Sequence, residues 1–224
     1  MLTGATRLVG LIGNPVAESL SPRMQNAAFA ARALDWAYVP LPVEADQLES
    51  AVAGLPVLGF AGANVTVPYK TAVLAYCDEL DEFAERAGSV NTIVVRDRRL
   101  HASSTDGLAV AGAVHAEGAR VLILGAGGAA QAVATALADA GAAAITLAAR
   151  KAEQAEGLAL RLRTIFPDHE VGAAEGWPPT TESAMLIVNA TPMRESPVVE
   201  LRAEHQIVDL AYSGDGMETG LVRA

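Results

Sequence analysis

Two short segments of this 224-residue chain combine residue types and spacings that can do chemistry. One is Asn64-Val-Thr66-Val-Pro68-Tyr-Lys70, which places two small polar side chains, a proline and a lysine at the end of an apolar run. Side chains at the end of a strand can converge on a cleft, so this segment is a candidate ligand site. Taken alone, Lys70 would be interpreted as a solvated residue at a helix start, because lysines are mostly exposed.

The second segment is a glycine-rich turn, Gly125-Ala126-Gly127-Gly128-Ala129-Ala130, which follows the apolar run 121–124. Gly125 can take the tight turn after a strand, Gly127 lets the backbone approach a pyrophosphate, and Ala130 lets helix and strand pack closely. Free N–H groups at the start of the following helix then face the phosphates. The pattern predicts a dinucleotide site. The alternative is a purely structural turn, because glycine and alanine are abundant in this chain.

The elements that must position these segments alternate in the manner of an α/β protein. We expect strands at 7–12, 36–43, up to Asn64, 89–95, 99–103, 121–124 and 144–148, with buried strands at 185–188 and 206–210. We expect helices at 22–34, with Ser21 as N-cap, and at 46–55, 78–86 and 107–117, and after the glycine turn. The predicted fold is an N-terminal α/β domain, residues 1–106, followed by a Rossmann-type doubly wound nucleotide-binding domain, residues 107–224.

Charge and composition limit the partners of the chain. The formal net charge of −10 argues against nucleic acid and anionic membranes, because phosphate neutralisation needs clustered basic residues. The run 121–138 is uncharged, but its glycines and Gln131 divide it into strand, turn and helix, so we reject a transmembrane segment. Any anionic ligand must therefore meet a local basic patch.

Cysteine and histidine usage argues against a metal or disulfide framework. Cys77 is the single cysteine, which is compatible with a reducing cytosol. The histidines are scattered, without metal-ligand spacing, and are His101, His115, His169 and His205. The N-terminus does not have the pattern of a secretory leader. We therefore expect no metal and a cytoplasmic protein.

Several segments together resemble the shikimate dehydrogenase family, from about Leu8 to the end of the chain. They occur in the order of the family and are Ser19-Leu-Ser21-Pro22, Asn64-Val-Thr66-Val-Pro68-Tyr-Lys70, Gly88-Ser-Val-Asn91-Thr92, Ser104-Thr105-Asp106-Gly107 and Asn189-Ala-Thr191-Pro192. The resemblance implies an enzyme of chorismate and aromatic amino acid biosynthesis, which interconverts shikimate and 3-dehydroshikimate with a nicotinamide cofactor. The combination is far more specific than any one of these segments.

The resemblance also implies a role for each matching residue on the substrate side. Ser19 and Ser21 would hydrogen-bond the substrate carboxylate, and Asn64, Thr66, Asn91 and Asp106 would line the side that binds hydroxyl groups. Lys70 and Asp106 would be the catalytic pair. Our hypothesis is that Lys70 is the principal acid/base and that Asp106 orients Lys70 and the substrate, although the residues alone leave open which group carries the proton.

On the cofactor side, the resemblance assigns the 2′-phosphate of NADP to Arg150, and Lys151 adds charge at the same place. An NAD-preferring site would offer Asp or Glu there, so NADP is preferred. Asn189 and Thr191 would lie beside the cofactor. Tyr212 would lie near the active-site cleft, or would be a core tyrosine with its hydroxyl at the surface.

The chain departs from the family pattern at several points. Ser104 and Ala149 each replace a usual Asn, and the loop 192–194 lacks the usual glycine before Met193. The chain ends at Ala224, where the family continues with a strand, helices and a substrate-contacting glutamine, so we expect one face of the pocket to be open. The sequence leaves open whether this short end is natural.

Two alternatives remain. One is a quinate/shikimate dehydrogenase that uses NAD(P). The other is a non-catalytic nucleotide- or metabolite-binding relative, against which the presence of both Lys70 and Asp106 argues. The resemblance also permits a homodimer.

Overall fold

The computed structural model describes residues 2–213 and 216–224. It divides the chain into two compact units, Met1–Thr105 and Asp106–Ala224. The division falls one residue before the boundary expected from the sequence. Within the described residues, no helix is both long and apolar enough to cross a bilayer.

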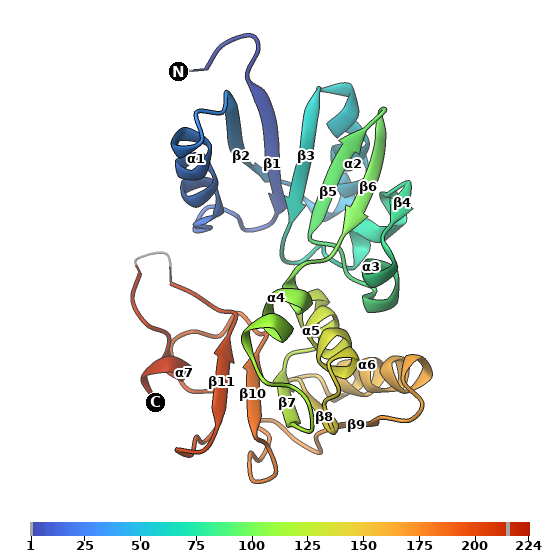
Figure 1. Ribbon diagram of the computed structural model, residues 1–224, viewed down its shortest axis with the longest axis vertical. Helices are drawn as coiled ribbons and strands as arrows, with labels where there is room; N and C mark the ends of the chain where they lie inside the picture. Colours follow the sequence, from blue (N-terminus) through green and yellow to red (C-terminus); the bar gives the residue numbers. More distant parts are fainter. Residues whose placement is uncertain (1, 214–215) are drawn as a thin grey trace. The chain divides into compact units, whose positions relative to one another are not determined.

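The first unit is built on a six-stranded mixed sheet with the strand order β2-β1-β3-β5-β6-β4 (Figure 1). Its strands are β1 (Arg7–Gly13), β2 (Trp36–Pro42), β3 (Phe60–Val65), β4 (Glu79–Leu80), β5 (Thr92–Arg96) and β6 (Arg99–Ser103). Its helices are α1 (Ser21–Ala31), α2 (Leu48–Val57) and α3 (Glu82–Ala87), with 3-10 turns η1 (Ala45–Gln47) and η2 (Ala72–Tyr76). β1 pairs in parallel with β2 and β3, whereas β5 runs antiparallel to β3 and β6.

The two crossovers β1-α1-β2 and β2-α2-β3 run in opposite directions along the sheet. Because such crossovers are right-handed, α1 and α2 must lie on opposite faces. The packing agrees: Ile12 belongs to the core with Leu55 of α2, whereas its neighbour Leu11 packs with Tyr38 and Phe29 of α1. Successive side chains of β1 point to opposite faces of the sheet and therefore pack into two different cores.

The second unit is a five-stranded parallel sheet with the order β11-β10-β7-β8-β9. Its strands are β7 (Arg120–Leu124), β8 (Ala144–Ala148), β9 (Glu170–Ala173), β10 (Leu186–Asn189) and β11 (Gln206–Asp209). Its helices are α4 (Asp106–Ala113), α5 (Gly128–Asp139), α6 (Ala152–Ile165) and α7 (Gly220–Arg223). Val121 and Ile123 face the core formed with α5 and α6, and Leu122 and Leu124 face a second core. The predicted α/β fold class is confirmed, and the apolar run 121–138 is divided between β7 and α5.

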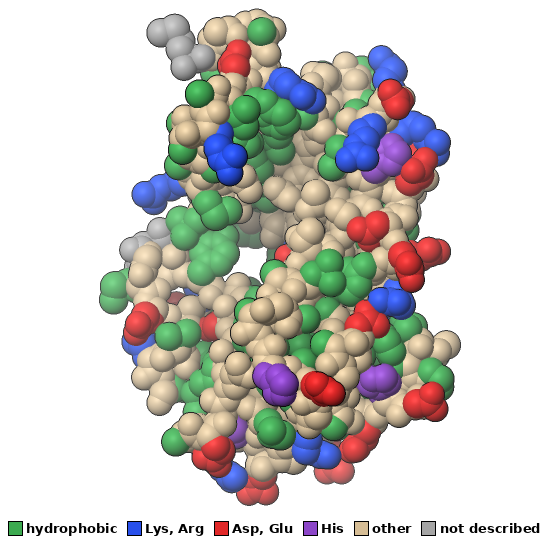
Figure 2. Space-filling view, in the orientation of Figure 1, with side chains coloured by type: hydrophobic (Ala, Val, Ile, Leu, Met, Phe, Trp, Pro, Cys, Tyr) green, Lys and Arg blue, Asp and Glu red, His purple; other side chains and the backbone are tan. Residues whose placement is uncertain are grey.

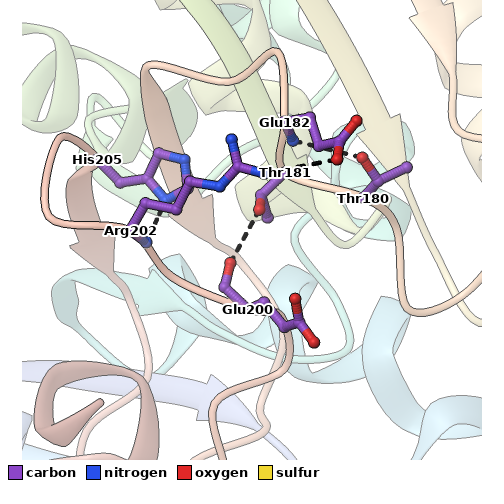
Figure 3. Close-up of polar contacts among 6 residues, drawn as sticks. All are labelled: Thr180, Thr181, Glu182, Glu200, Arg202 and His205. Atoms are coloured by element: carbon purple, nitrogen blue, oxygen red, sulfur yellow. Dashed lines mark hydrogen bonds and ion pairs between the residues drawn. The ribbon is translucent and has the colours of Figure 1, made fainter.

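Hydrogen bonds and one ion pair join two loops of the second unit, 180–182 and 200–205 (Figure 3). The Thr181 hydroxyl donates to the Glu200 carbonyl at 2.9 Å, and Arg202 pairs with Glu182 at 3.5 Å. The Arg202 backbone N–H donates to His205 Nδ1 at 3.0 Å. These contacts hold the chain between β9 and β10 against the chain that precedes β11.

Three sequence-based expectations for the elements are wrong. Residues 78–86 form not one helix but β4 and then α3, because Asp81 caps α3 by accepting from Ala84 N at 2.6 Å while Glu79 and Leu80 pair with β6. β11 is an edge strand, with Gln206 and Ile207 exposed rather than buried. Ser21 is not the N-cap of α1: the helix starts at Ser21 after Leu20, whose backbone is already helical.

Charged side chains of both signs are interspersed on the face that Figure 2 shows. With a net charge of −10 for the whole chain, long-range attraction for an anion is weak. An anionic ligand therefore depends on the particular cations and N–H groups that line its site.

Candidate active site

The amide of Asn64 is held in one orientation at the carboxyl end of β3. Tyr38 Oη donates to Asn64 Oδ1 at 2.8 Å. Asn64 Nδ2 in turn donates to the Asn91 carbonyl at 3.1 Å and to Thr92 Oγ1 at 3.2 Å. Asn64 and Thr92 are register partners across β3 and β5, which explains why residues so distant in the sequence meet here. The carbonyl oxygen of Asn64 keeps a second lone pair for a ligand.

Asn91 fixes the start of the segment that leads to Asp106. Its side chain is 8% exposed. Its Nδ2 donates to Thr105 Oγ1 at 2.9 Å, and its Oδ1 accepts from Thr105 N at 3.1 Å. Because Asp106 follows Thr105 directly, the chain enters Asp106 from an anchored point.

Lys70 lies on a tightly held turn after β3. Thr66 N donates to the Ile12 carbonyl at 2.8 Å, and Tyr69 N donates to the Thr66 carbonyl at 2.9 Å. The Lys70 carbonyl accepts from Val90 N at 2.7 Å, which fixes its backbone next to the segment carrying Asn91. The Lys70 side chain is half-buried, unlike a solvated lysine at a helix start. The first unit thus gathers Asn64, Thr66, Lys70 and Asn91 at the ends of β3 and β5.

Ser19 and Ser21 lie at the first turn of α1, and both are half-buried. Ser19 Oγ accepts from Ser21 N at 3.3 Å, a local bond that takes the place of the expected cap by Ser21. Tyr38 packs against Val16, which precedes this turn, and hydrogen-bonds Asn64. Tyr38 therefore joins the serine segment to the amide cluster.

Tyr38 is a residue of this site that the sequence analysis missed. It is 3% exposed, and its phenol orients Asn64. The sequence offers one signal for such a residue. A tyrosine that is buried in a strand needs a polar partner for its hydroxyl group. Which partner it finds is decided by the pairing of β1 with β2 and β3, not by any local pattern.

Cys77 does not supply a nucleophile. Burial raises the pKa of its thiol to about 11, and the neighbouring Asp78 carboxylate acts in the same direction. The thiol is therefore protonated at neutral pH, whereas a thiolate is the reactive form. In the part of the chain that the structure describes, no group of His, Cys, Asp and Glu side chains could hold a metal ion.

Ser104, which stands where the resemblance expects Asn, is 1% exposed and its hydroxyl has no hydrogen-bond partner among the described residues. A buried hydroxyl without a partner is destabilising. We expect Ser104→Ala to leave the free energy of unfolding unchanged or to raise it by up to about 1 kcal/mol, measured by urea denaturation. Thr105→Ala is the contrast: its hydroxyl bonds Asn91, so we expect a loss of about 1 kcal/mol. Equal losses in the two variants would contradict this interpretation.

The glycine turn of the second unit leaves open space beside the start of α5. Gly125 has φ of +114°, and a Cβ there would lie 3.0 Å from the Ala190 carbonyl oxygen. A Cβ on Gly127 would meet nothing within 4 Å, so open space borders the turn. α5 begins at Gly128, and Ala130 is fully buried where helix and sheet pack. The N–H groups of the first turn of α5 can therefore face an anion in this space.

The strand order places a crevice at this turn. From β7 the chain continues to β8 on one side, whereas β10 pairs on the other side. In open α/β sheets, ligands bind outside the carboxyl ends of the strands at such a switch point. The Ala190 N–H donates to the Leu124 carbonyl at 2.8 Å, so the loop after β10 borders the glycine turn.

A pocket of about 310 Å³ adjoins the turn on the side of α6. Its lining comprises Ala126, Gly127, Gln131, Glu153, Gln154, Gly157, Leu158 and Arg161. Lys151 is the N-cap of α6, and Lys151 and Arg150 are both exposed at its start. Burial lowers the pKa of the Arg161 guanidinium. The two residues to which the resemblance assigns the 2′-phosphate are therefore both exposed to solvent.

Asn189 is fully buried and uses its amide internally. Its Nδ2 donates to Asp209 Oδ1 at 2.8 Å and to the Met193 carbonyl at 3.1 Å. Its Oδ1 accepts from the backbone N–H of Thr191 at 3.0 Å and from its hydroxyl at 2.6 Å. Asn189 therefore shapes the loop after β10, and Thr191, which is half-buried, is the residue of this pair that remains accessible to a ligand.

Tyr212 follows β11 in the second unit. It is 48% exposed, so it is not a core tyrosine. Its carbonyl accepts from Arg194 Nη1 at 3.3 Å, which connects the end of the β10 loop to the chain after β11.

Comparison with known proteins identifies the same family for both units. Residues 11–93 match the family model for the shikimate dehydrogenase substrate binding domain, and residues 108–174 match the model for shikimate / quinate 5-dehydrogenase. A shikimate dehydrogenase (NADP(+)) of Salinibacter ruber is 42% identical over 99% of this chain and 84% of the relative.

Solved structures that resemble this chain belong to the same family. The crystal structure of a shikimate dehydrogenase in complex with NADP+ has a TM-score of 0.86 at 33% identity and covers 100% of this chain and 82% of that one. A quinate dehydrogenase of Corynebacterium glutamicum in complex with NAD has a TM-score of 0.80 at 29% identity, with coverages of 97% and 84%. On the identity of its relatives and the extent of these matches, the chain belongs to the shikimate dehydrogenase family.

Proposed function

We propose that this protein is an NADP-dependent shikimate dehydrogenase, which reversibly reduces 3-dehydroshikimate to shikimate. The observation that carries the proposal is that the two family domains match in order on one chain, at residues 11–93 and 108–174. The relative from Salinibacter ruber is itself named for this activity with NADP(+).

The polar groups of the first unit suit a polyhydroxylated acid. Asn64, Thr66 and Asn91 are assigned to the substrate hydroxyl groups, and Ser19 and Ser21 to its carboxylate. The amides of Asn64 and Asn91 are held by internal hydrogen bonds, so little conformational freedom is lost when substrate binds. A site built around hydroxyl groups strongly rejects analogues that lack one.

Acid/base catalysis is assigned to Lys70. When bound, the nicotinamide of NADP supplies the hydride chemistry. Oxidation of the alcohol also releases the hydroxyl proton, which Lys70 Nζ takes, and in the reverse reaction Lys70 returns it to the substrate oxygen. Asp106 is assigned to orient Lys70 and the substrate. Tyr212 is retained as a substrate-side residue.

Lysine usage supports this assignment. The chain has 16 basic residues, and Lys70 and Lys151 are its only lysines. Arginine serves elsewhere as the source of positive charge. An ammonium group can release its proton in a protein, whereas a guanidinium remains charged, so a lysine at position 70 offers a property that arginine lacks.

Cofactor preference is assigned to Arg150 and Lys151, with the turn 125–130 and Thr191 around the rest of NADP. We expect Arg150→Ala to raise the KM for NADP by about tenfold or more while the KM for NAD changes little, because a charge-assisted bond to the 2′-phosphate is lost. Arg120→Ala is the matched control, since Arg120 begins β7 and pairs with Glu170 at 3.6 Å. An unchanged KM for NADP in Arg150→Ala would show that the 2′-phosphate is bound elsewhere.

The deciding experiment is NADPH formation by the purified chain with shikimate. Quinate and NAD are tested in parallel, because the likeness to the quinate dehydrogenase favours that activity as the second candidate. Turnover with shikimate and NADP supports the proposal, whereas preferential turnover of quinate with NAD would replace it. Tight NADP binding without turnover would favour a non-catalytic relative.

We also propose that the protein works in the cytoplasm on free small molecules, without a nucleic-acid partner, and forms a homodimer. The single, half-buried cysteine and the acidic net charge support the first two points. Light scattering of the purified chain tests the dimer.

A further inference from the structure

The carboxylate of Asp209 joins three segments of the second unit. Asp209 is the last residue of β11. Its Oδ1 accepts from Asn189 Nδ2 at 2.8 Å and from the Ala211 N–H at 2.9 Å. Its Oδ2 accepts from the hydroxyl of Thr219, which caps α7. One side chain therefore ties the end of β10, the chain after β11 and the start of α7.

Asp209 is one of two acceptors that fix the orientation of the Asn189 amide, and the other is the Met193 carbonyl. The two ends of an amide have nearly the same shape, so their hydrogen-bond partners determine the orientation. A carboxylate only accepts, so the NH2 group of Asn189 must face Asp209. The amide oxygen then faces Thr191, where it accepts from both the backbone N–H and the hydroxyl. Through Asn189, Asp209 thus helps to hold the first turn of the loop after β10 in place.

The loop held in this way borders the cofactor crevice. A Cβ on Gly125 would lie 3.0 Å from the Ala190 carbonyl oxygen and 3.5 Å from Thr191 Cγ2, so the loop lies against the glycine turn. The far end of the loop is also anchored, because Gly220 N donates to the Arg194 carbonyl at 2.7 Å. A Cβ on Gly220 would lie 2.6 Å from the backbone of Ser196. One end of the loop is therefore bonded to Asp209 through Asn189, and the other end is bonded to the residue that follows Thr219.

We propose that Asp209 is a positioning residue for NADP, acting through Asn189 on the loop 190–194 that borders the glycine turn. This inference rests on the proposed function. The hydrogen bonds of Asp209 go to Asn189, Ala211 and Thr219, which hold the loop, so we expect its effect on cofactor affinity.

The test is calorimetric titration of the purified full chain with NADP, without substrate. Asp209→Ala removes both acceptor oxygens, whereas Asp209→Asn keeps one carbonyl oxygen to accept from Asn189. Thr219→Val removes only the hydroxyl. Thr181→Val is the control, because it removes a threonine hydroxyl that bonds a backbone carbonyl between other loops of the same unit (Figure 3).

We expect Asp209→Ala to raise the Kd for NADP by about tenfold or more, and Asp209→Asn to stay within about threefold of the parent chain. In steady-state kinetics of Asp209→Ala, the KM for NADP should rise while kcat and the KM for shikimate are unchanged. Asn189→Ala in the Asp209→Ala background should raise the Kd for NADP little further, because Asp209 acts through Asn189. If Asp209→Ala does not fold, a weaker affinity in Thr219→Val than in Thr181→Val supports the inference.

Affinity of Asp209→Ala equal to that of the parent chain, or equal losses in Asp209→Ala and Thr181→Val, would overturn the inference and leave the proposed function standing. A parent chain that does not bind NADP at all would overturn the proposed function, and the role of Asp209 with it. The two failures are therefore distinguishable from the parent titration alone.

Discussion

Lys70→Ala is expected to lower kcat for shikimate oxidation by about 10³-fold, because the variant has no side chain to take the hydroxyl proton. Lys70 is half-buried, and its backbone is held by the Val90 N–H, so the side chain starts from a fixed point beside the segment of Asn91. The KM for NADP should change little, since the cofactor groups lie in the second unit. Steady-state kinetics in which the concentrations of shikimate and NADP are both varied measures kcat and the two KM values.

Lys70→Arg separates proton transfer from charge. Arginine keeps the positive charge but does not release its proton, so we expect a loss of kcat nearly as large as in Lys70→Ala. The contrast is Lys151→Arg, in which charge alone is needed at the cofactor, and there the KM for NADP should stay within about threefold. High turnover in Lys70→Arg would show that Lys70 contributes only charge and that another group carries the proton.

Gly107→Ala is expected to destabilise the second unit by about 3 kcal/mol, the upper end of the usual effect of overpacking. A Cβ on Gly107 would lie 2.1 Å from the Ala132 carbonyl oxygen and 3.0 Å from Ala136 Cβ, at the contact between α4 and α5. The nearest atom belongs to the backbone of a helix and cannot rotate away. α4 and α5 must therefore separate, and α5 carries the N–H groups of the glycine turn.

Gly112→Ala is the matched control within the same helix. A Cβ there would meet nothing within 4 Å. Alanine favours the helix over glycine, so we expect the free energy of unfolding to rise by up to about 1 kcal/mol. Urea denaturation of both variants makes the comparison, and similar stabilities would mean that α4 and α5 are not in tight contact at Gly107.

The glycine turn was predictable because its chemistry is local. A strand that turns sharply into a helix needs a positive φ at one position and small side chains at the next ones, and Gly125 and Ala130 meet these needs within six residues. The same holds for the order of strands and helices in both units. Short and edge elements were harder. β4 has only two residues, too few for a hydrophobic pattern, and was not identified. The strand at β11 was predicted, but its exposure at the edge of the sheet was not.

The sequence by itself determined the fold class, because the hydrophobic pattern and the glycine turn are local. Its short segments also carry the resemblance to the family, and that resemblance implies the residues assigned to the reaction. The tertiary structure alone decided how these residues are held. Tyr38 reaches Asn64 through strand pairing, and Asp209 reaches Asn189 and Thr219 across the second sheet. The physical reason is that a hydrogen bond between distant segments depends on the register of strands and the path of loops, which no local pattern encodes.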